Sequence, residues 1–188
     1  MSGELVAFGF ASSFAAYIVL ALSIRHRAVE RGRRSVRRGH RLSQALPYFV
    51  WVPYVVIALH PGPELPLPAV VRWSGLGLVV GGVGIAMWAA LTLGAHFDHE
   101  VEVHEGHEVV RRGPYAVVRH PVYSGLALHH LGAFVATGNL LFLTGTLLVS
   151  FPAFYVRAKE EERLLRAQLG HSYDDYSRDV AMLVPGIR

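Results

Sequence analysis

Residues 122–156 read VYSGLALHHLGAFVATGNLLFLTGTLLVSFPAFYV, and the way this apolar stretch is divided decides the fold. A helix rises about 1.5 Å per residue, so about 20 residues cross the hydrocarbon core of a bilayer, and this stretch is far too long for one span. The residues ATGN at 136–139 interrupt it, and glycine and asparagine favour turns. We therefore predict a tight helical hairpin, with spans over about 122–135 and 140–156.

The rest of the chain has the composition of a membrane protein. Of its 188 residues, 52% are hydrophobic and only 17% are charged. Further apolar segments of spanning length lie at about 5–24, 42–59 and 69–93. The first of them lacks a basic prelude, so we expect it to stay in the mature chain rather than to be removed as a signal peptide. We predict an all-α polytopic bundle of about five transmembrane helices, forming one domain over 1–188.

The distribution of arginine predicts the topology. The connection at 25–41, RHRAVERGRRSVRRGHR, is rich in arginine, and cytoplasmic loops carry such an excess of basic residues. Five spans then place the N-terminus outside and put the segments 94–121 and 157–188, the second with a helix, on the cytoplasmic side. If 122–156 were instead a single span, the C-terminal segment would lie opposite the basic connection. The bias toward Ala, Val, Gly and Arg is typical of a GC-rich prokaryotic source, so we expect a prokaryotic plasma membrane.

Charge and cysteine content exclude several classes of function. The net charge of +4 at pH 7 comes from arginine, since Lys159 is the single lysine. Such concentrated charge favours contact with anionic lipid headgroups, and no nucleic-acid-binding pattern accompanies it. The absence of cysteine excludes disulfides, thiolate metal sites and a cysteine nucleophile.

Two polar segments flank the predicted hairpin. In the first, 94–121, glycines and prolines break regular structure, and we expect an ordered loop on the membrane surface. It carries Gly113-Pro114-Tyr115 and Arg119-His120-Pro121, and Tyr123 and Gly125 follow. The second segment starts with a helix in which Arg157 and Glu161, four residues apart, share a face. Gly170 is its expected C-cap.

These residues resemble the signature of the isoprenylcysteine carboxyl methyltransferase and phospholipid methyltransferase superfamily. The pattern GPYxxxRHPxYxG matches residues 113–125. The patterns RxxxEExxL and GxxYxxY match residues 157–165 and 170–176, and Val184-Pro185-Gly186 follows where the family has a similar proline. The resemblance covers roughly residues 92–186, whereas the first ninety residues match only in hydropathy.

The resemblance implies an integral membrane enzyme that uses S-adenosylmethionine and releases S-adenosylhomocysteine. Arg119 and His120 would bind the carboxylate of the cofactor, and Glu161 or Glu162 its ribose hydroxyls or its ammonium group. Tyr115 and Tyr123 would flank the adenine or the sulfonium. The full set expected to bind the cofactor is His107, Val109, Pro114, Tyr115, Arg119, His120, Tyr123, Gly125, Glu161 and Glu162.

Arg157 and Glu161 are the expected catalytic residues. If the acceptor is a carboxylate, no strong base is needed, and Arg157 orients it while Glu161 holds Arg157. An amine or hydroxyl acceptor must lose a proton, and His107, His120 or a glutamate would then act as the base. We expect a lipophilic small-molecule or lipid-modified acceptor that enters sideways from the bilayer. Prenylcysteine, amino-phospholipid, isoprenoid-acid and quinone-like acceptors all stay open.

Other functions are compatible with parts of the sequence. The histidines at 96, 99, 104 and 107 suggest zinc or iron, but strand-like residues separate the two pairs, so no metal is expected. His129 and His130 lie inside the fourth span, where they line an acceptor tunnel or make a neutral interhelical hydrogen bond. The alternatives are a phospholipid or amine methyltransferase, an NADPH-dependent reductase similar to sterol reductases, and a non-enzymatic membrane protein.

Overall fold

The computed structural model describes residues 35–38, 51–60, 62–94, 102–104 and 109–187. Its helices are α3 (Val52–Leu59), α4 (Ala69–Leu93), α5 (Pro121–Thr137), α6 (Leu140–Gly145), α7 (Phe151–Leu169) and α8 (His171–Asp179). The 3-10 turn η2 (Gly113–Ala116) precedes α5, and the π-helical turn η3 (Thr146–Ser150) joins α6 to α7. The predicted span at 5–24 and residues 42–50 of the next one lie outside the described residues, so the expected number of spans stays a prediction.

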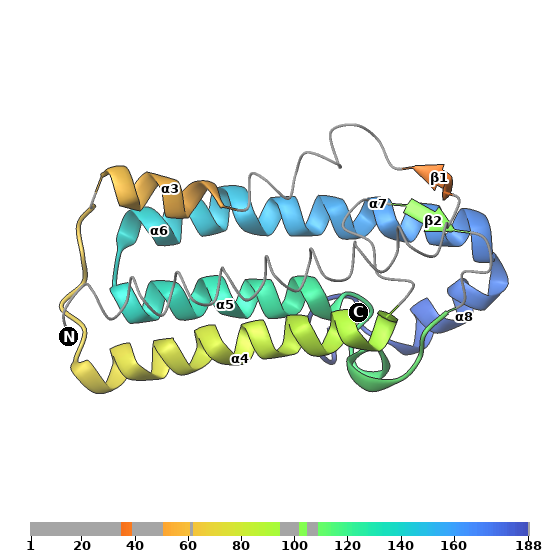
Figure 1. The fold of residues 1–188 in the computed structure, drawn as a ribbon, viewed down its shortest axis with the longest axis horizontal. Coiled ribbons are helices and arrows are strands. Elements are labelled where there is room, and N and C mark those ends of the chain that lie inside the picture. The colour runs from red at the N-terminus through yellow and green to blue at the C-terminus, as the bar shows by residue number, and fades with distance from the viewer. Residues whose placement is uncertain (1–34, 39–50, 61, 95–101, 105–108, 188) are drawn as a thin grey trace.

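The predicted turn at 136–139 is confirmed. Helix α5 ends at Thr137, and Gly138 follows with a φ of 72°, a left-handed conformation that glycine adopts without a Cβ clash. The side chain of Asn139 then caps α6, because its Oδ1 accepts a hydrogen bond from the backbone N–H of Phe142 at 2.9 Å. The chain therefore reverses here, and α7 runs back along α5 (Figure 1).

Among the described residues, two helices are long and apolar enough to cross a membrane. One is α4, whose 25 residues have a mean hydropathy of 2.0 and the same bounds as the predicted span at 69–93. The other is the continuous helix Leu140–Leu169, formed by α6, η3 and α7, whose mean hydropathy is 1.5. Its apolar part ends at Val156, and a charged half continues from Arg157. The same helix thus forms both a membrane span and a wall of the polar region beyond it.

Small residues bring α4 and α5 into close contact along their length (Figure 1). A Cβ placed on Gly82 would lie 2.5 Å from the carbonyl oxygen of Gly125. A Cβ placed on Gly132 would lie 2.6 Å from the backbone nitrogen of Val79 and 2.8 Å from the oxygen of Gly75. Gly75 and Gly82 of α4 therefore serve the close packing of α4 on α5.

The expected all-α fold is confirmed for the described residues, and one short strand pair accompanies the helices. Strands β1 (Ser35–Arg38) and β2 (Glu102–His104) form an antiparallel pair in which Arg37 lies opposite Val103. The segment 94–121 is therefore not a loop throughout. Charged and apolar residues alternate at 100–103, and this period of two suits a strand. Because β2 lies against α7, the strand pair is at the same end of the bundle as α8 (Figure 1).

The hairpin brings both polar segments to that end of the bundle. The last turn of α4, the start of α5, the charged half of α7 and α8 all lie there (Figure 1). At the opposite end, the connection before α4 meets the turn after α5. There the Leu65 N–H donates to the Gly138 carbonyl at 2.8 Å, and Arg72 Nη1 donates to the Thr137 carbonyl at 2.9 Å.

Candidate active site

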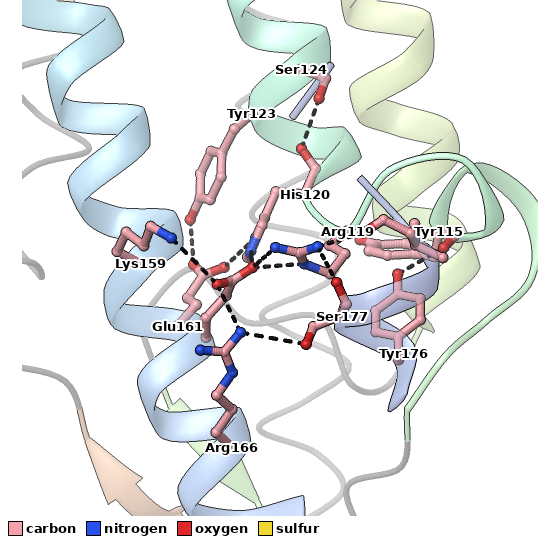
Figure 2. Close-up of polar contacts among 12 residues, drawn as sticks. Tyr115, Arg119, His120, Tyr123, Ser124, Lys159, Glu161, Arg166, Tyr176 and Ser177 are labelled. Atoms are coloured by element: carbon pink, nitrogen blue, oxygen red, sulfur yellow. Dashed lines mark hydrogen bonds and ion pairs between the residues drawn. The ribbon is translucent and has the colours of Figure 1, made fainter. Parts of the chain in front are cut away.

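The GPY turn is fixed between α4 and α8. Turn η2 buries Pro114 and Tyr115, and a Cβ on Gly113, whose φ is 58°, would lie 3.1 Å from Thr92 Oγ1 at the end of α4. The hydroxyl of Tyr176 in α8 donates to the carbonyl of Tyr115 at 2.7 Å (Figure 2). Burial raises the pKa of Tyr176 to about 12, so this donor keeps its proton at neutral pH.

Arg119 connects the residues before α5 to both α7 and α8. Its Nε and Nη2 lie 2.7 Å and 2.6 Å from Oε1 of Glu162. Its Nη1 donates to the carbonyl of Ser177 at 2.9 Å and also to the carbonyl of Val180. The side chain of Arg119 is 8% exposed and that of Glu162 is 2% exposed, so this ion pair is screened little by solvent.

His120 lies between two adjacent carboxylates. Its Nδ1 is 3.4 Å from Oε2 of Glu161, and its Nε2 is 3.6 Å from Oε1 of Glu162. Burial alone would lower the pKa of His120, but the hydrogen bonds and charges of the two glutamates outweigh burial and raise the pKa. His120 therefore stays protonated to a higher pH than a free histidine, and it neutralises part of the acidic pair.

Tyr123 joins the two expected catalytic residues. Arg157 Nε donates to the Tyr123 hydroxyl oxygen at 2.7 Å, and that hydroxyl donates to Oε1 of Glu161. Arg157 Nε also lies 3.6 Å from the same Glu161 oxygen, so the prediction that these residues share a helix face is confirmed. Arg157 is 5% exposed, whereas the side chain of Glu161 is 27% exposed. The cluster therefore reaches the molecular surface at Glu161.

Two buried polar atoms of this cluster are available to bind a cofactor. Among the described residues, neither His120 Nε2 nor Glu162 Oε2 has a hydrogen-bond partner. An unsatisfied buried polar group costs about 1–3 kcal/mol, so such atoms indicate a ligand or a water. A carboxylate oxygen suits an ammonium or hydroxyl donor, and a protonated ring nitrogen suits a carboxylate. S-adenosylmethionine carries all of these groups, so the residues present fit it.

The predicted site residues fall into distinct places. The cluster contains Arg119, His120, Tyr123, Arg157, Glu161 and Glu162, and Pro114 and Tyr115 lie in the neighbouring turn. Figure 2 shows Arg119, His120, Tyr123 and Glu161 together, with Tyr115 to one side. His107 lies outside the described residues, and Val109 is half-buried at the start of the described loop. Gly125 lies in the contact between α4 and α5, where a Cβ would meet the carbonyl oxygen of Gly82 at 2.6 Å. Helix packing accounts for a glycine at this position.

Sequence reasoning missed several groups that surround Glu162. Lys159 Nζ and Arg166 Nη2 lie 3.9 Å and 3.6 Å from its Oε2. Their spacing was a usable signal, because residues three and four positions away share a helix face. The carbonyls of Ser177 and Val180 could not be found from the sequence, because every residue has a backbone carbonyl.

The histidine pair in α5 is buried among aromatic rings. His129 is 2% exposed and His130 is fully buried. Nδ1 of His130 lies 2.8 Å from the Leu126 carbonyl one turn earlier, and its ring centroid lies 5.1 Å from that of Tyr54 and 5.6 Å from that of Phe154. His130 thus joins α5 to α3 and α7. Its placement along an acceptor tunnel stays a prediction.

Three of the four histidines considered as metal ligands lie outside the described residues. Residues 96, 99 and 107 lie outside the described part of the chain, and His104 is the last residue of β2. Within the described ranges, no three His, Cys, Asp or Glu residues are placed to hold a metal ion.

The chain is similar in sequence to known proteins. Residues 75–167 match the model of the isoprenylcysteine carboxyl methyltransferase family. A rice protein described as a probable protein-S-isoprenylcysteine O-methyltransferase (Oryza sativa subsp. indica) is 33% identical over 127 residues, which cover 66% of each chain. A Xenopus laevis protein-S-isoprenylcysteine O-methyltransferase is 35% identical over 116 residues, 61% of this chain and 40% of the relative.

The fold is also similar to that of a solved structure. The eukaryotic intramembrane Ras methyltransferase, an isoprenylcysteine carboxyl methyltransferase, matches with a TM-score of 0.60 and 28% identity over 81% of this chain and 55% of that one. This chain therefore spans just over half of that enzyme and no more than about two thirds of the curated relatives cited. With two helices of membrane length, it is an integral membrane protein. The matched family model, the relatives and the shared fold lead to one conclusion: the chain belongs to the isoprenylcysteine carboxyl methyltransferase family.

Proposed function

We propose that this chain transfers a methyl group from S-adenosylmethionine to a carboxylate at the end of a lipophilic acceptor, of the isoprenylcysteine kind that its relatives' names specify. One observation carries the proposal. The two halves of the family signature, although separated by a membrane hairpin, meet in one buried cluster of charges (Figure 2). Family membership supports the same activity.

The cofactor is held by two buried atoms that have charged neighbours but no hydrogen-bond partner among the described residues. Glu162 Oε2 takes the ammonium group or a ribose hydroxyl, and His120 Nε2 takes the carboxylate. The rings of Tyr115 and Tyr123 provide aromatic faces beside them. When bound, the cofactor supplies an electrophilic methyl group on a sulfonium. The protein's task is then to place the acceptor in line with that methyl group and to exclude water.

The partners of the glutamates favour a carboxylate acceptor over an amine. An amine must lose a proton to a base, but the carboxylates described in this cluster are already paired with cations: Glu161 with Arg157 and Glu162 with Arg119. A carboxylate is already an anion and needs no base. Arg157 orients the acceptor carboxylate through a charge-assisted bond, and Tyr123 keeps the guanidinium of Arg157 in position.

The position of Arg157 suits an acceptor that arrives from the lipid. Directly before it, Tyr155 and Val156 are 51% and 48% exposed at the end of the apolar half of the helix, while Arg157 is buried. A lipophilic chain in the bilayer can therefore lie within one helical turn of the cluster. On the positive-inside rule, this end of the bundle faces the cytoplasm, with the N-terminus outside, in a prokaryotic plasma membrane.

A binding titration on the purified protein in detergent separates the candidate functions. Binding of S-adenosylhomocysteine without binding of NADPH supports a methyltransferase, whereas the reverse result supports a reductase. Transfer of radiolabelled methyl groups to an S-prenylated cysteine, but not to its carboxamide or to an amino-phospholipid, supports the carboxylate acceptor. A label found on the amine would overturn that choice.

The assignment of roles within the cluster has its own test. Arg157→Ala removes the group that orients the acceptor, so it should leave S-adenosylhomocysteine binding intact and depress turnover. Glu162→Gln replaces the carboxylate that holds the cofactor, so it should weaken binding. The opposite pattern in the two variants would contradict this division.

A further inference from the structure

Arg119 has little hydrogen-bonding capacity left for a ligand. A guanidinium carries five N–H groups. The N–H of Nε and one N–H of Nη2 face Oε1 of Glu162 at 2.7 Å and 2.6 Å, and the two N–H groups of Nη1 donate to the carbonyls of Ser177 and Val180. Among the described residues, this leaves one N–H, on Nη2, for another partner. A bidentate interaction with a cofactor carboxylate requires two N–H groups, so Arg119 would have to break one of its present hydrogen bonds.

The backbone after α8 runs beside residues 118–120. We call residues 113–125, which match the first family pattern, the cofactor motif. We call residues 180–183 the strap. Val118 and Ala181 form a parallel β-bridge, the Arg119 N–H donates to the Ala181 carbonyl at 2.8 Å, and the His120 N–H donates to the Met182 carbonyl at 3.1 Å. The strap therefore sets the backbone position of the two residues at the centre of the charged cluster.

Side chains anchor both ends of the strap. At its start, the Val180 carbonyl accepts from Arg119, as described above. At its end, Ser124 Oγ donates to the Leu183 carbonyl at 2.6 Å. Met182 and Leu183 also pack against the apolar cluster that contains Tyr123. The strap is thus held at its start by Arg119, which is paired with Glu162 of α7, and at its end by Ser124 in the first turn of α5.

We propose that Arg119 is a positioning residue that fixes the strap across the cofactor site, and not a ligand of the cofactor's carboxylate. Arg119 acts through Glu162 on one side and through the carbonyls of Ser177 and Val180 on the other. Losing this link frees the strap, and with it the backbone of His120, so any cofactor dissociates faster. The inference rests on the proposed function, because it presumes that the site binds S-adenosylmethionine.

Arg119→Lys is the suitable variant. Alanine would leave Glu162, 2% exposed, as a buried carboxylate without its main partner, which by itself destabilises a protein strongly. Lysine keeps the positive charge but lacks the planar fork that reaches the two carbonyls and the carboxylate together. The matched control is Arg178→Lys, since Arg178 lies on α8, is 71% exposed and pairs only with Asp175 among the described residues.

Two ligands distinguish a positioning role from direct binding. S-adenosylhomocysteine carries the amino-acid carboxylate, whereas its decarboxylated analogue, 5′-deoxy-5′-(3-aminopropylthio)adenosine, keeps the adenosine, the thioether and the ammonium group but lacks that carboxylate. If Arg119 holds the strap, Arg119→Lys weakens both ligands by the same factor, about tenfold for the loss of one or two charge-assisted hydrogen bonds. If Arg119 grips the carboxylate, only S-adenosylhomocysteine binding is weakened, and the proposal is overturned.

Hydrogen–deuterium exchange on the ligand-free protein gives a readout that does not depend on the cofactor. The amides of residues 176–184 should exchange faster in Arg119→Lys than in the wild type, and at the wild-type rate in Arg178→Lys. Unchanged exchange in Arg119→Lys would overturn the proposal. If the wild type binds neither ligand, the proposed function fails, while the exchange result still tests the strap.

Ser124→Ala provides a second route if the Arg119 variant does not fold. It removes the hydrogen bond to the Leu183 carbonyl without touching Arg119. Equal weakening of both ligands, together with faster exchange in the strap, supports the strap as the element through which Arg119 acts. Unchanged affinities and exchange contradict it.

Discussion

At the scale of single residues, the hydroxyl of Tyr123 is the link between the groups that we assign to catalysis. It accepts from Arg157 Nε at 2.7 Å and donates to Glu161. Because a hydrogen bond to a charged group contributes about 1.5–3 kcal/mol, its loss lets the guanidinium move away from the position that the acceptor needs.

Tyr123→Phe keeps the ring and removes only this hydroxyl. We expect kcat to fall by about tenfold to a hundredfold, as the loss of such a bond implies, with little change in the affinity for S-adenosylhomocysteine. Single-turnover methyl transfer and a binding titration measure the two quantities. Tyr155→Phe, at an exposed position on α7, is the control and should behave as the wild type. Equal kcat values in both variants would rule out this role for Tyr123.

His120 should make stability depend on pH. Folding raises the pKa of His120 through Glu161 and Glu162, so the folded state binds the proton more tightly than the unfolded state. The stabilisation is fully present below about pH 6.5, the ordinary pKa of histidine, and is lost as the pH rises through the raised pKa. We expect the difference in Tm between the wild type and His120→Gln, measured in detergent, to shrink over that range. A difference that does not change with pH would contradict the charge assignment.

Some contacts of the charged cluster could be predicted from the sequence, and others could not. The spacing of Arg157 and Glu161 predicted their shared face, because helix geometry alone dictates it. Nothing in the spacing could reveal that Arg119 would be occupied by Glu162 and by two carbonyls. Glu162 lies on α7, Ser177 on α8 and Val180 directly after α8. The residue types do not reveal a backbone acceptor, because every residue has a carbonyl. The sequence predicts contact between Arg119 and the cofactor from charge alone, and this contact stays a prediction.

At the scale of elements, the contact between α4 and α5 sets the position of the site, because α5 carries Tyr123 near its start. Glycine is required where the backbones touch and is replaceable elsewhere on the same helix. A Cβ on Gly82 would lie 2.5 Å from the Gly125 oxygen and 2.6 Å from the His129 nitrogen. At Gly81, which is exposed, a Cβ would meet no described atom within 4 Å.

Gly82→Ala and Gly81→Ala form a matched pair that tests this contact. Forcing a methyl group into a packed interface costs about 1–3 kcal/mol, so Gly82→Ala should lower Tm and, by displacing α5, the methyl-transfer rate. Gly81→Ala should leave both near the wild-type values. If the two variants lose the same stability, the packing of α4 on α5 does not depend on the glycine at 82.

The elements differ in how well the sequence predicted them. The hairpin was predictable because Gly138 and Asn139 have local reasons to turn the chain, a left-handed φ and a helix cap. The pairing of β1 with β2 was not, because Ser35–Arg38 and Glu102–His104 are far apart in the chain and the basic residues of β1 lack a clear alternation. The π-helical turn Thr146–Ser150 also had no signal, since it lies inside an apolar run that reads as ordinary helix.

At the scale of the whole molecule, the bundle separates a polar end from an opposite end with short connections (Figure 1). Strand β1 belongs to the basic connection, yet through β2 it lies against α7 at the polar end. The arginine-rich connection, the cofactor motif and α8 should therefore all face the same side of the membrane.

Cysteine labelling tests this arrangement cleanly, because the chain contains no cysteine. Ser35→Cys in β1 and Ser172→Cys in α8 should react with a membrane-impermeant maleimide from the same side, in inverted vesicles and not in intact cells. Glu64→Cys, in the connection at the opposite end, should show the reverse pattern. If Ser35→Cys and Ser172→Cys label from opposite sides, the hairpin does not exist in the membrane.

The turn at Gly138 and Asn139 has a consequence for how the enzyme is made. Arg119 precedes this turn in the chain and Glu162 follows it, so the ribosome makes the two halves of the proposed donor site at different times. A nascent chain that stops between them lacks the carboxylate partner of Arg119. We therefore expect such an arrested chain to capture no S-adenosylhomocysteine.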